Sequence, residues 1–277
     1  MEELKTEKKP EKETQKDHVV VSFTSFPGGI AGAGEVVKSL LAGSVLPDKI
    51  VLYVTMKEFG DRGLPEDLIK LTEETEIFEI RDYPENLRSY RKLIPALKDF
   101  PESIIVTVDD DVIYDKDLLR MLLETHERVP EAIVAHRTKL INPEKPYIQW
   151  KKIRHRHCLL RKYHKNPLIL PTGVGGVLYP PRALKTEMLE PCLFTKIAPT
   201  TDDIWFWAAA VLNDIYVLPV PFGKYKTQDI PKTKEFALKT VNFTEGKDIN
   251  KETFDTILSL YPDIRGKISK GRHSRWL

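Results

Sequence analysis

The 277-residue chain contains only two cysteines, Cys158 and Cys192, which are too few to build a disulfide framework. It also lacks any run of about 18 consecutive apolar residues, so we predict no transmembrane helix. The N-terminal segment has no apolar stretch typical of a secretory signal peptide. We therefore expect a cytoplasmic, reducing location, or a peripheral position on the inner face of the cell membrane.

The chain also has little net charge, because 43 Lys and Arg nearly balance 41 Asp and Glu. Such a balance is unlike that of a protein that coats nucleic acid along its whole surface. Residues 1–17 hold five Lys, five Glu and one Asp, with almost no apolar side chains. This segment cannot bury enough surface to offset the entropy lost on ordering, so we predict a disordered charged tail.

Short β-branched runs alternate with amphipathic segments along the next part of the chain. Strands are predicted at residues 19–24, 50–55, 77–80, 104–108 and 133–135, and helices at 35–43, 66–74, 88–98 and 115–128. This alternation predicts an α/β fold with a mostly parallel sheet flanked by helices. We expect a single domain over residues 18–220, continued by a C-terminal helical extension with a basic end over residues 221–277.

Three carboxylates, Asp109, Asp110 and Asp111, directly follow the buried strand 104–108. Ligands bind beyond the carboxyl ends of the strands in such sheets, and neighbouring like charges need a compensating cation or hydrogen-bond donors. Asp109 and Asp111 are two residues apart and can face one centre, where their oxygens suit Mg²⁺ or Mn²⁺. A solvated turn, or a cap on the next helix, is the alternative interpretation.

A second acidic pair, Asp202 and Asp203, opens a Trp-rich helix predicted over residues 202–212. Thr200 to Asp203 matches the spacing of a capping box. Acidic side chains also favour a helix N-terminus. One of the two acids could instead act as a general base on an acceptor hydroxyl. A Gly-rich segment, residues 171–176, lies between the two acidic clusters and is consistent with either a ligand loop or a tight turn.

Five motifs occur in a characteristic order. They are VSFTSFP at residues 21–27, SYRKLIPAL at 89–97, VTVDDD at 106–111, PTGVGGVLYPP at 171–181 and TDDIWFW at 201–207. Together they resemble bacterial glycosyltransferases of the GT-A fold. The chain is similar to the family-two-like enzymes that build surface polysaccharide and lipopolysaccharide, and the resemblance covers about residues 18–220.

The resemblance implies a nucleotide-sugar donor, UDP- or GDP-linked, and Mn²⁺ or Mg²⁺ held by Asp109 and Asp111. It further implies a donor site that includes Thr24, Ser25, Arg88, Lys92, Asp109, Asp110, Gly175 and Gly176. In inverting enzymes a member of the second acidic pair is the catalytic base, and analogy favours Asp203 over Asp202. The acceptor would be a saccharide or a lipid-linked molecule. Trp150 and Trp205 could stack on sugar rings or belong to the core.

Two segments, residues 145–165 and 265–277, are rich in Lys and Arg and contain no acid. Either they form a solvated face, or they bind an anionic membrane surface or a lipid-diphosphate acceptor. Nucleic acid is a less favoured partner, because no aromatic RNA-binding motif accompanies the basic residues.

Two alternatives stay open at this point. Asp109 and Asp111 also fit a haloacid-dehalogenase-like, Mg²⁺-dependent phosphatase, in which the first Asp is the nucleophile. In that class, however, the nucleophile strand comes near the N-terminus, whereas at least two βα units precede it here. The second alternative is a non-catalytic protein that binds sugar or nucleic acid.

Overall fold

The structure is a computed structural model that describes residues 18–153, 165–221, 225–230 and 247–273. Its centre is a seven-stranded sheet. In spatial order the strands are β11 (Val217–Pro219), β6 (Ile133–Ala135), β10 (Val177–Tyr179), β4 (Ile104–Thr107), β1 (Val19–Thr24), β2 (Lys49–Val54) and β3 (Phe78–Asp82). All neighbours run parallel except β10, which is antiparallel to both β4 and β6. The expected α/β fold with a mostly parallel sheet is therefore confirmed.

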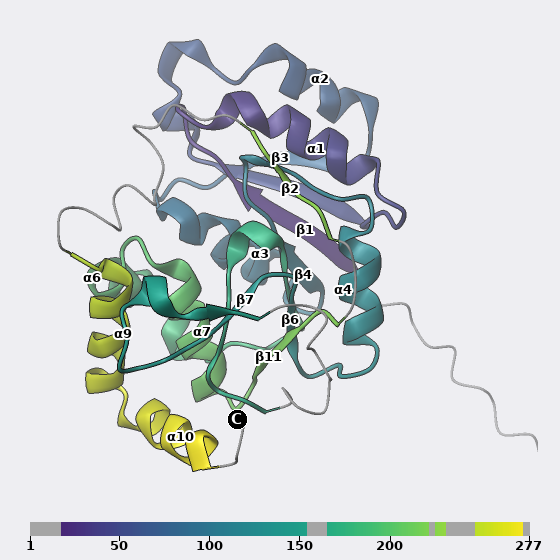
Figure 1. The fold of residues 1–277 in the computed structure, drawn as a ribbon. Helices are drawn as coiled ribbons and strands as arrows, with labels where there is room; N and C mark the ends of the chain where they lie inside the picture. Colours follow the sequence, from purple (N-terminus) through teal and green to yellow (C-terminus); the bar gives the residue numbers. More distant parts are fainter. Residues whose placement is uncertain (1–17, 154–164, 222–224, 231–246, 274–277) are drawn as a thin grey trace, which may run out of the picture.

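Helices cover both faces of this sheet, because successive strand residues point to opposite sides. Val21 of β1 packs with α1 (Ala33–Leu41), α2 (Glu66–Glu74) and α4 (Leu118–His126). Val20 packs on the other face, among α3 (Ile94–Asp99), α6 (Pro191–Ile197) and α7 (Asp202–Leu212). Figure 1 shows α1 and α2 together on one side of β1–β3, with α7 on the other. The sheet is thus buried on both faces, which explains its continuous apolar strands.

The predicted helix over residues 88–98 is two elements in the structure. A 3₁₀ helix, η4 (Arg88–Lys92), is followed by α3, which begins at Ile94. Pro95 lies in the first turn of α3, where a missing N–H breaks no helical hydrogen bond. The two tryptophans considered for sugar stacking, Trp150 and Trp205, are 2% and 0% exposed. The stacking interpretation is therefore wrong for both, and each belongs to the core.

Beyond the main sheet, two smaller β elements complete the described chain. A three-stranded antiparallel sheet, which we call the small sheet, has β7 (Thr138–Leu140) between β8 (Lys151–Lys152) and β9 (Ile169–Pro171). A second pair joins β5 (Val112–Ile113) to β12 (Gln228–Asp229). The latter pairing brings a segment beyond residue 220 beside the loop that follows β4.

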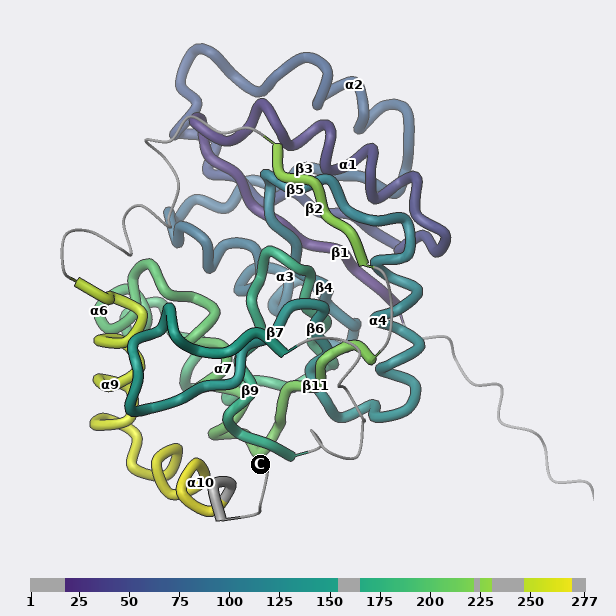
Figure 2. The backbone as a smooth tube through the Cα atoms, in the orientation of Figure 1, coloured from purple at the N-terminus to yellow at the C-terminus, as the bar shows by residue number. Residues whose placement is uncertain are grey.

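The C-terminal helices α9 (Ile249–Leu260) and α10 (Pro262–His273) lie against the main body, as Figure 2 shows. Phe254 of α9 is fully buried and its ring lies 5.2 Å from that of Trp150 and 5.5 Å from that of Trp207. These helices therefore share the core on the α7 side of the sheet. Within the described residues, no helix is long and apolar enough to span a bilayer.

Candidate active site

The loops after β1 and β4 lie side by side at the carboxyl edge of the sheet. The two strands pair in parallel, with Ser22 opposite Thr107, so Ser25 and Asp110 follow them at the same level. The Ser25 hydroxyl donates a hydrogen bond of 2.5 Å to Oδ2 of buried Asp110. A Cβ on Gly29 would lie 2.5 Å from the same oxygen, so a larger residue there would displace the Asp110 carboxylate. Asp110 therefore ties the two loops together.

Lys92 connects the two acidic clusters. Its Nζ lies 3.0 Å from Oδ1 of Asp109 and 3.0 Å from Oδ2 of Asp202, and its side chain is 8% exposed. The Ser22 hydroxyl donates to the Lys92 carbonyl at 2.6 Å, which fixes the end of η4 against β1. Burial alone would lower the pKa of Lys92, but the nearby carboxylates raise it well above its usual value. Lys92 is therefore a permanent cation between Asp109 and Asp202.

The adjacent acids at the start of α7 have different surroundings. Asp202 accepts a hydrogen bond of 2.9 Å from the Ser89 hydroxyl and forms the ion pair with Lys92. Asp203 instead accepts from the backbone N–H of Gly173, at 3.0 and 3.2 Å to its two oxygens. Burial, and then the charge of Asp202, raise the pKa of Asp203 to about 7, although Lys92 opposes the shift. Asp203 is thus poised to exchange a proton near neutral pH.

The capping-box interpretation of Thr200 to Asp203 is wrong. The N-cap residue of α7 is Thr201, and its side chain makes no capping hydrogen bond. The solvated-turn interpretation of the first cluster also fails, because Asp110 is buried and the side chain of Asp109 is only 29% exposed.

The turn η7 (Gly173–Gly175) brings the two clusters to one point. A Cβ on Gly173 would lie 2.7 Å from Lys92 Nζ, 3.1 Å from Asp203 Oδ1 and 3.6 Å from Asp109 Oδ1. These three groups therefore converge within contact distance of a single position. A side chain at this position would have to displace the Lys92 ammonium, so the absence of a Cβ lets the three groups approach the turn closely.

The other predicted site residues lie in varied surroundings. Thr24 donates to the Tyr53 carbonyl at 2.8 Å, so its hydroxyl is already engaged within the protein. Arg88 is exposed and has a positive φ of 53°. A Cβ on Gly175 would meet the side chain of Arg137 at 2.7 Å, and one on Gly176 would meet Leu118 at 2.7 Å. Their roles in donor binding, and that of Asp111, stay predictions.

Sequence reasoning missed Arg91, which is 2% exposed. Its guanidinium donates to the Thr24 hydroxyl at 2.8 Å, to the Ser25 carbonyl at 2.6 Å and to the Thr55 hydroxyl. Arg91 thereby fastens the loop after β1 to the end of β2. The neighbouring Lys92 was a candidate and Arg91 was not, because nothing in the local pattern shows which of two adjacent cations points inward.

The acidic cluster after β4 fits a divalent cation in an open site, where the ligand supplies part of the coordination. No group of three or more His, Cys, Asp or Glu within the described ranges is arranged to enclose a metal. Asp109 and Asp111 are both partly exposed and offer hard oxygen ligands two residues apart. Mg²⁺ and Mn²⁺ are commonly held by one or two carboxylates together with substrate phosphates. The donor set fits a metal that arrives with a phosphate ligand, and not a closed protein cage.

Only part of the two basic segments is described. In the first, Lys145, Lys151, Lys152 and Lys165 are exposed, whereas Arg154, Arg156, Arg161 and Lys162 lie outside the described residues. In the second, Lys267 of α10 forms an ion pair of 2.7 Å with Asp214 and so helps to hold α10 in place. Binding of a membrane by these segments stays a prediction.

The sequence matches no protein-family model and no curated protein. Its structure is similar to that of the mannosyltransferase PcManGT from Pyrobaculum calidifontis in complex with GDP-Man and Mn²⁺. The TM-score is 0.54 at 13% identity, over 95% of this chain and 77% of that chain. Two structures of UDP-glucose pyrophosphorylase from Acinetobacter baumannii, one with UTP bound, give TM-scores of 0.42 and 0.43. Their identities are 14% and 11%, over 88% and 92% of this chain and 99% and 98% of theirs. The first likeness shows that the chain shares the fold of a glycosyltransferase.

Proposed function

We propose that this chain is a metal-dependent glycosyltransferase of the GT-A fold. It would transfer a sugar from a UDP- or GDP-linked donor to a hydroxyl of a saccharide or lipid-linked acceptor. The observation that carries the proposal is the convergence of Asp109, Lys92 and Asp203 around Gly173. The shared fold with a mannosyltransferase that binds GDP-Man and Mn²⁺ supports it.

In this proposal the two acidic clusters have separate tasks. Asp203 removes the proton from the acceptor hydroxyl as its oxygen attacks the anomeric carbon. The bond from that carbon to the donor phosphate breaks, and the nucleoside diphosphate leaves with the electron pair. A single displacement of this kind inverts the anomeric configuration. A pKa of about 7 lets Asp203 both accept and release a proton at neutral pH.

Lys92 and the loop residues act as positioning groups. Lys92 holds Asp202 and Asp109 in place through its two ion pairs, so that Asp203 alone stays available to the acceptor. Ser25 and Arg91 keep the β1 loop in place where the nucleotide would lie. A divalent cation at Asp109 and Asp111, when bound, would stabilise the charge that develops on the leaving diphosphate.

The test compares donor binding with sugar transfer in matched Asp→Asn variants. Thermal unfolding is followed with UDP or GDP, with and without Mn²⁺, and donor consumption is measured with a panel of nucleotide sugars. Asp111→Asn should abolish the Mn²⁺-dependent stabilisation by nucleotide. Asp203→Asn should keep that stabilisation and lower turnover by about a hundredfold or more. Asp255→Asn, at a side chain on α9 that is 55% exposed, is the control and should change neither quantity.

Near-normal turnover of Asp203→Asn would refute its role as the base. A failure of every nucleotide to stabilise the wild-type protein in Mn²⁺ would refute the glycosyltransferase itself. The phosphatase alternative requires Mg²⁺-dependent hydrolysis of p-nitrophenyl phosphate that is lost in Asp109→Asn. The binding-protein alternative requires tight RNA or sugar binding without any turnover.

A further inference from the structure

Three cations gather at the small sheet. Lys139 of β7 lies directly opposite Lys152 of β8, so their side chains share a face. The ladder between β7 and β9 continues through Thr172, whose N–H donates to the Arg137 carbonyl at 2.9 Å. Arg137 lies in the bend just before β7, two residues from Lys139, and its charge acts on the Lys139 ammonium. We call Arg137, Lys139 and Lys152 the cationic cluster.

The cationic cluster lacks the carboxylate partners that other cations of the chain have. Within the described residues, none of its three members forms an ion pair, whereas Lys92, Arg91 and Arg120 all do. Like charges opposite each other on a sheet are destabilising. Two cations in register, without an acid between them, therefore call for an anionic ligand.

Two further groups lie close to the cluster. Lys139 Nζ lies 3.4 Å from the centre of the Tyr147 ring and donates to the Tyr147 carbonyl at 3.3 Å, so it keeps only part of its donor capacity. Asp248 and Asp203 are the nearby acids, and the Asp248 carboxylate accepts the backbone N–H groups of Tyr147 and Lys251. Burial, and then the charge of Lys152, lower the pKa of Lys139 to about 8. The positive charge of the cluster is thus only weakly offset.

The cluster adjoins the proposed base. The Arg137 side chain fills the space where a Cβ of Gly175 would lie, at 2.7 Å. Gly175 belongs to the same three-residue turn as Gly173, whose N–H holds Asp203. Gly173 itself faces Lys92 and Asp109, where the donor is proposed to bind. An anion at the cluster would therefore lie near Asp203, whose charge also acts on Lys139.

We propose that Arg137, Lys139 and Lys152 bind a phosphate group of the acceptor and so present its hydroxyl to Asp203. This inference rests on the proposed glycosyltransferase function and specifies its acceptor as a phosphate ester or diphosphate ester. Arginine and lysine donate charge-assisted hydrogen bonds to phosphate oxygens, which are stronger than bonds between neutral groups. The phosphate can come from a lipid-linked sugar or from a soluble sugar phosphate.

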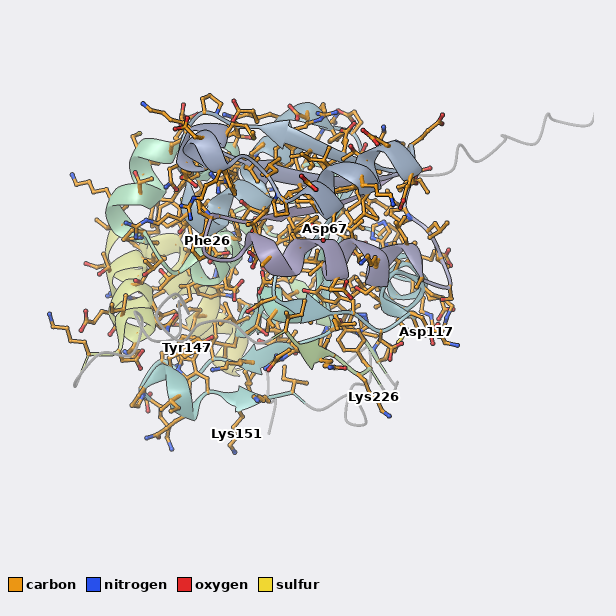
Figure 3. All side chains as sticks on the ribbon, turned by 90° about the horizontal axis from the view of Figure 1, so that it is seen from above. Phe26, Asp67, Asp117, Tyr147, Lys151 and Lys226 are labelled. Carbon is orange, nitrogen blue, oxygen red and sulfur yellow. The ribbon has the colours of Figure 1, made fainter. Side chains whose placement is uncertain are left out.

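The experiment uses two neighbouring lysines of β8 as a matched pair. Lys152 faces Lys139, whereas Lys151 lies opposite Leu140 and so points to the other face of the strand. Figure 3 shows Lys151 at the outer margin of the molecule. Both side chains are exposed, so Lys152→Glu and Lys151→Glu should fold equally well. The two variants carry the same change in net charge and differ in the face that carries it.

Binding of inorganic phosphate, citronellyl phosphate and citronellol to the full-length protein is measured by calorimetry at neutral pH. We expect Lys152→Glu to weaken binding of both phosphates by about tenfold or more, and Lys151→Glu to leave it unchanged. Lys139→Met should weaken it in the same direction. Tighter binding of citronellyl phosphate than of inorganic phosphate would identify a lipid-linked source, and equal binding a soluble one. Both results support the site.

The proposal is overturned if the wild-type protein binds neither phosphate, or if both β8 variants lose affinity equally. It is also overturned if citronellol binds as well as citronellyl phosphate, because the contact is then apolar. The response to UDP or GDP with Mn²⁺ is recorded on the same samples. If that response is absent while phosphate binding depends on Lys152, the glycosyltransferase proposal fails and the anion site stands. If the nucleotide response is present but phosphate binding does not depend on Lys152, only the anion site is refuted.

Discussion

Asp202 and Asp203 are chemically identical neighbours, yet their surroundings separate them. Asp202 pairs with Lys92 and accepts from Ser89, while Asp203, among the described residues, accepts only from the backbone N–H of Gly173. A carboxylate held by an ammonium group is a poor base, because its charged form is already stabilised. The arrangement therefore favours Asp203 for proton transfer on physical grounds, independently of any likeness to other proteins.

The raised pKa of Asp203 makes a prediction for stability. Its pKa in the folded protein is about 7, against an ordinary value of 3.8, so the folded state binds more protons between these pH values. Stability contributed by this group is therefore present at low pH and is lost as the pH rises through about 7. Asp203→Asn cannot ionise, so we expect it to unfold at a higher temperature than the wild type at pH 8, with a smaller difference at pH 5.

Thermal unfolding at the two pH values measures this effect, with Asp255→Asn as the exposed control. If the unfolding temperatures of the wild type and of Asp203→Asn changed equally between the two pH values, the pKa of Asp203 would not be raised.

Lys92 makes a second prediction at this scale. Lys92→Met removes the charge that pairs both Asp109 and Asp202, and it leaves these carboxylates close together. We expect a loss of about 3 kcal/mol in the free energy of unfolding, because breaking a buried ion pair leaves an uncompensated charge. Added Mn²⁺ should restore more stability to this variant than it gives the wild type, since the carboxylates then lack a competing cation.

Urea unfolding with and without Mn²⁺ measures both quantities. Lys196→Met, at an exposed lysine on α6, serves as the control and should be close to neutral. An equal Mn²⁺ effect in Lys92→Met and in the wild type would mean that the metal binds elsewhere.

At the scale of elements, the turn η7 determines the geometry of the site. It connects β9 of the small sheet to β10 of the main sheet, so its position depends on both. Tyr225 donates to the Gly175 carbonyl at 2.7 Å, and Tyr114 donates to that of Val174 at 3.4 Å. These two tyrosines fix the backbone of the turn. A larger side chain within it must therefore displace the neighbouring site residues.

Gly173→Ala tests this element. The new methyl group would lie 2.7 Å from Lys92 Nζ, so the ammonium must move away from Asp109 and Asp202. We expect transfer to fall by about a hundredfold, as for other misplacements of about 1 Å near a reacting centre. Turnover and the Mn²⁺-dependent nucleotide response are the measurements.

Gly266→Ala is the matched control, because nothing lies within 4 Å of a Cβ at Gly266 in α10. It should keep full turnover and gain up to about 1 kcal/mol of stability from the better helix propensity of alanine. Normal turnover of Gly173→Ala would show that the close approach of Lys92 to Gly173 is not needed for transfer.

At the scale of the whole molecule, the C-terminal helices close the core on the α7 side. Ile257, Ile264 and Ile268 are buried with the residues of α7. We propose that residues 221–277 are an extension of the domain over residues 18–220, and that the two unfold together.

Phe254→Ala checks this proposal. The substitution empties a fully buried position between Trp150 and Trp207, so we expect a loss of about 3–5 kcal/mol and one cooperative transition at a lower denaturant concentration. Leu260→Ala, at a side chain that is 54% exposed, should change stability far less. Two separate transitions, with only one shifted by Phe254→Ala, would identify the C-terminal helices as an independent unit.

Local sequence patterns were sufficient to predict the fold class of this chain. Runs such as residues 19–24 and 104–108 are mostly apolar because both faces of the sheet are covered, and they alternate with amphipathic helices. The same patterns predicted that acidic residues end a buried strand. They did not predict β10, because three apolar residues in a proline-rich stretch have no period that separates a strand from a loop.

Contacts between distant residues decided the rest. Lys92 and Asp202 are 110 positions apart, and only the packing of η4 against α7 brings them to 3.0 Å. The burial of Arg91 and Trp205 and the exposure of Arg88 are likewise set by the tertiary structure. A sequence specifies which charges exist and which strands they follow. Which of them are desolvated, paired or left open to a ligand depends on the elements that pack around them, because desolvation and Coulomb energies are determined by distance in space.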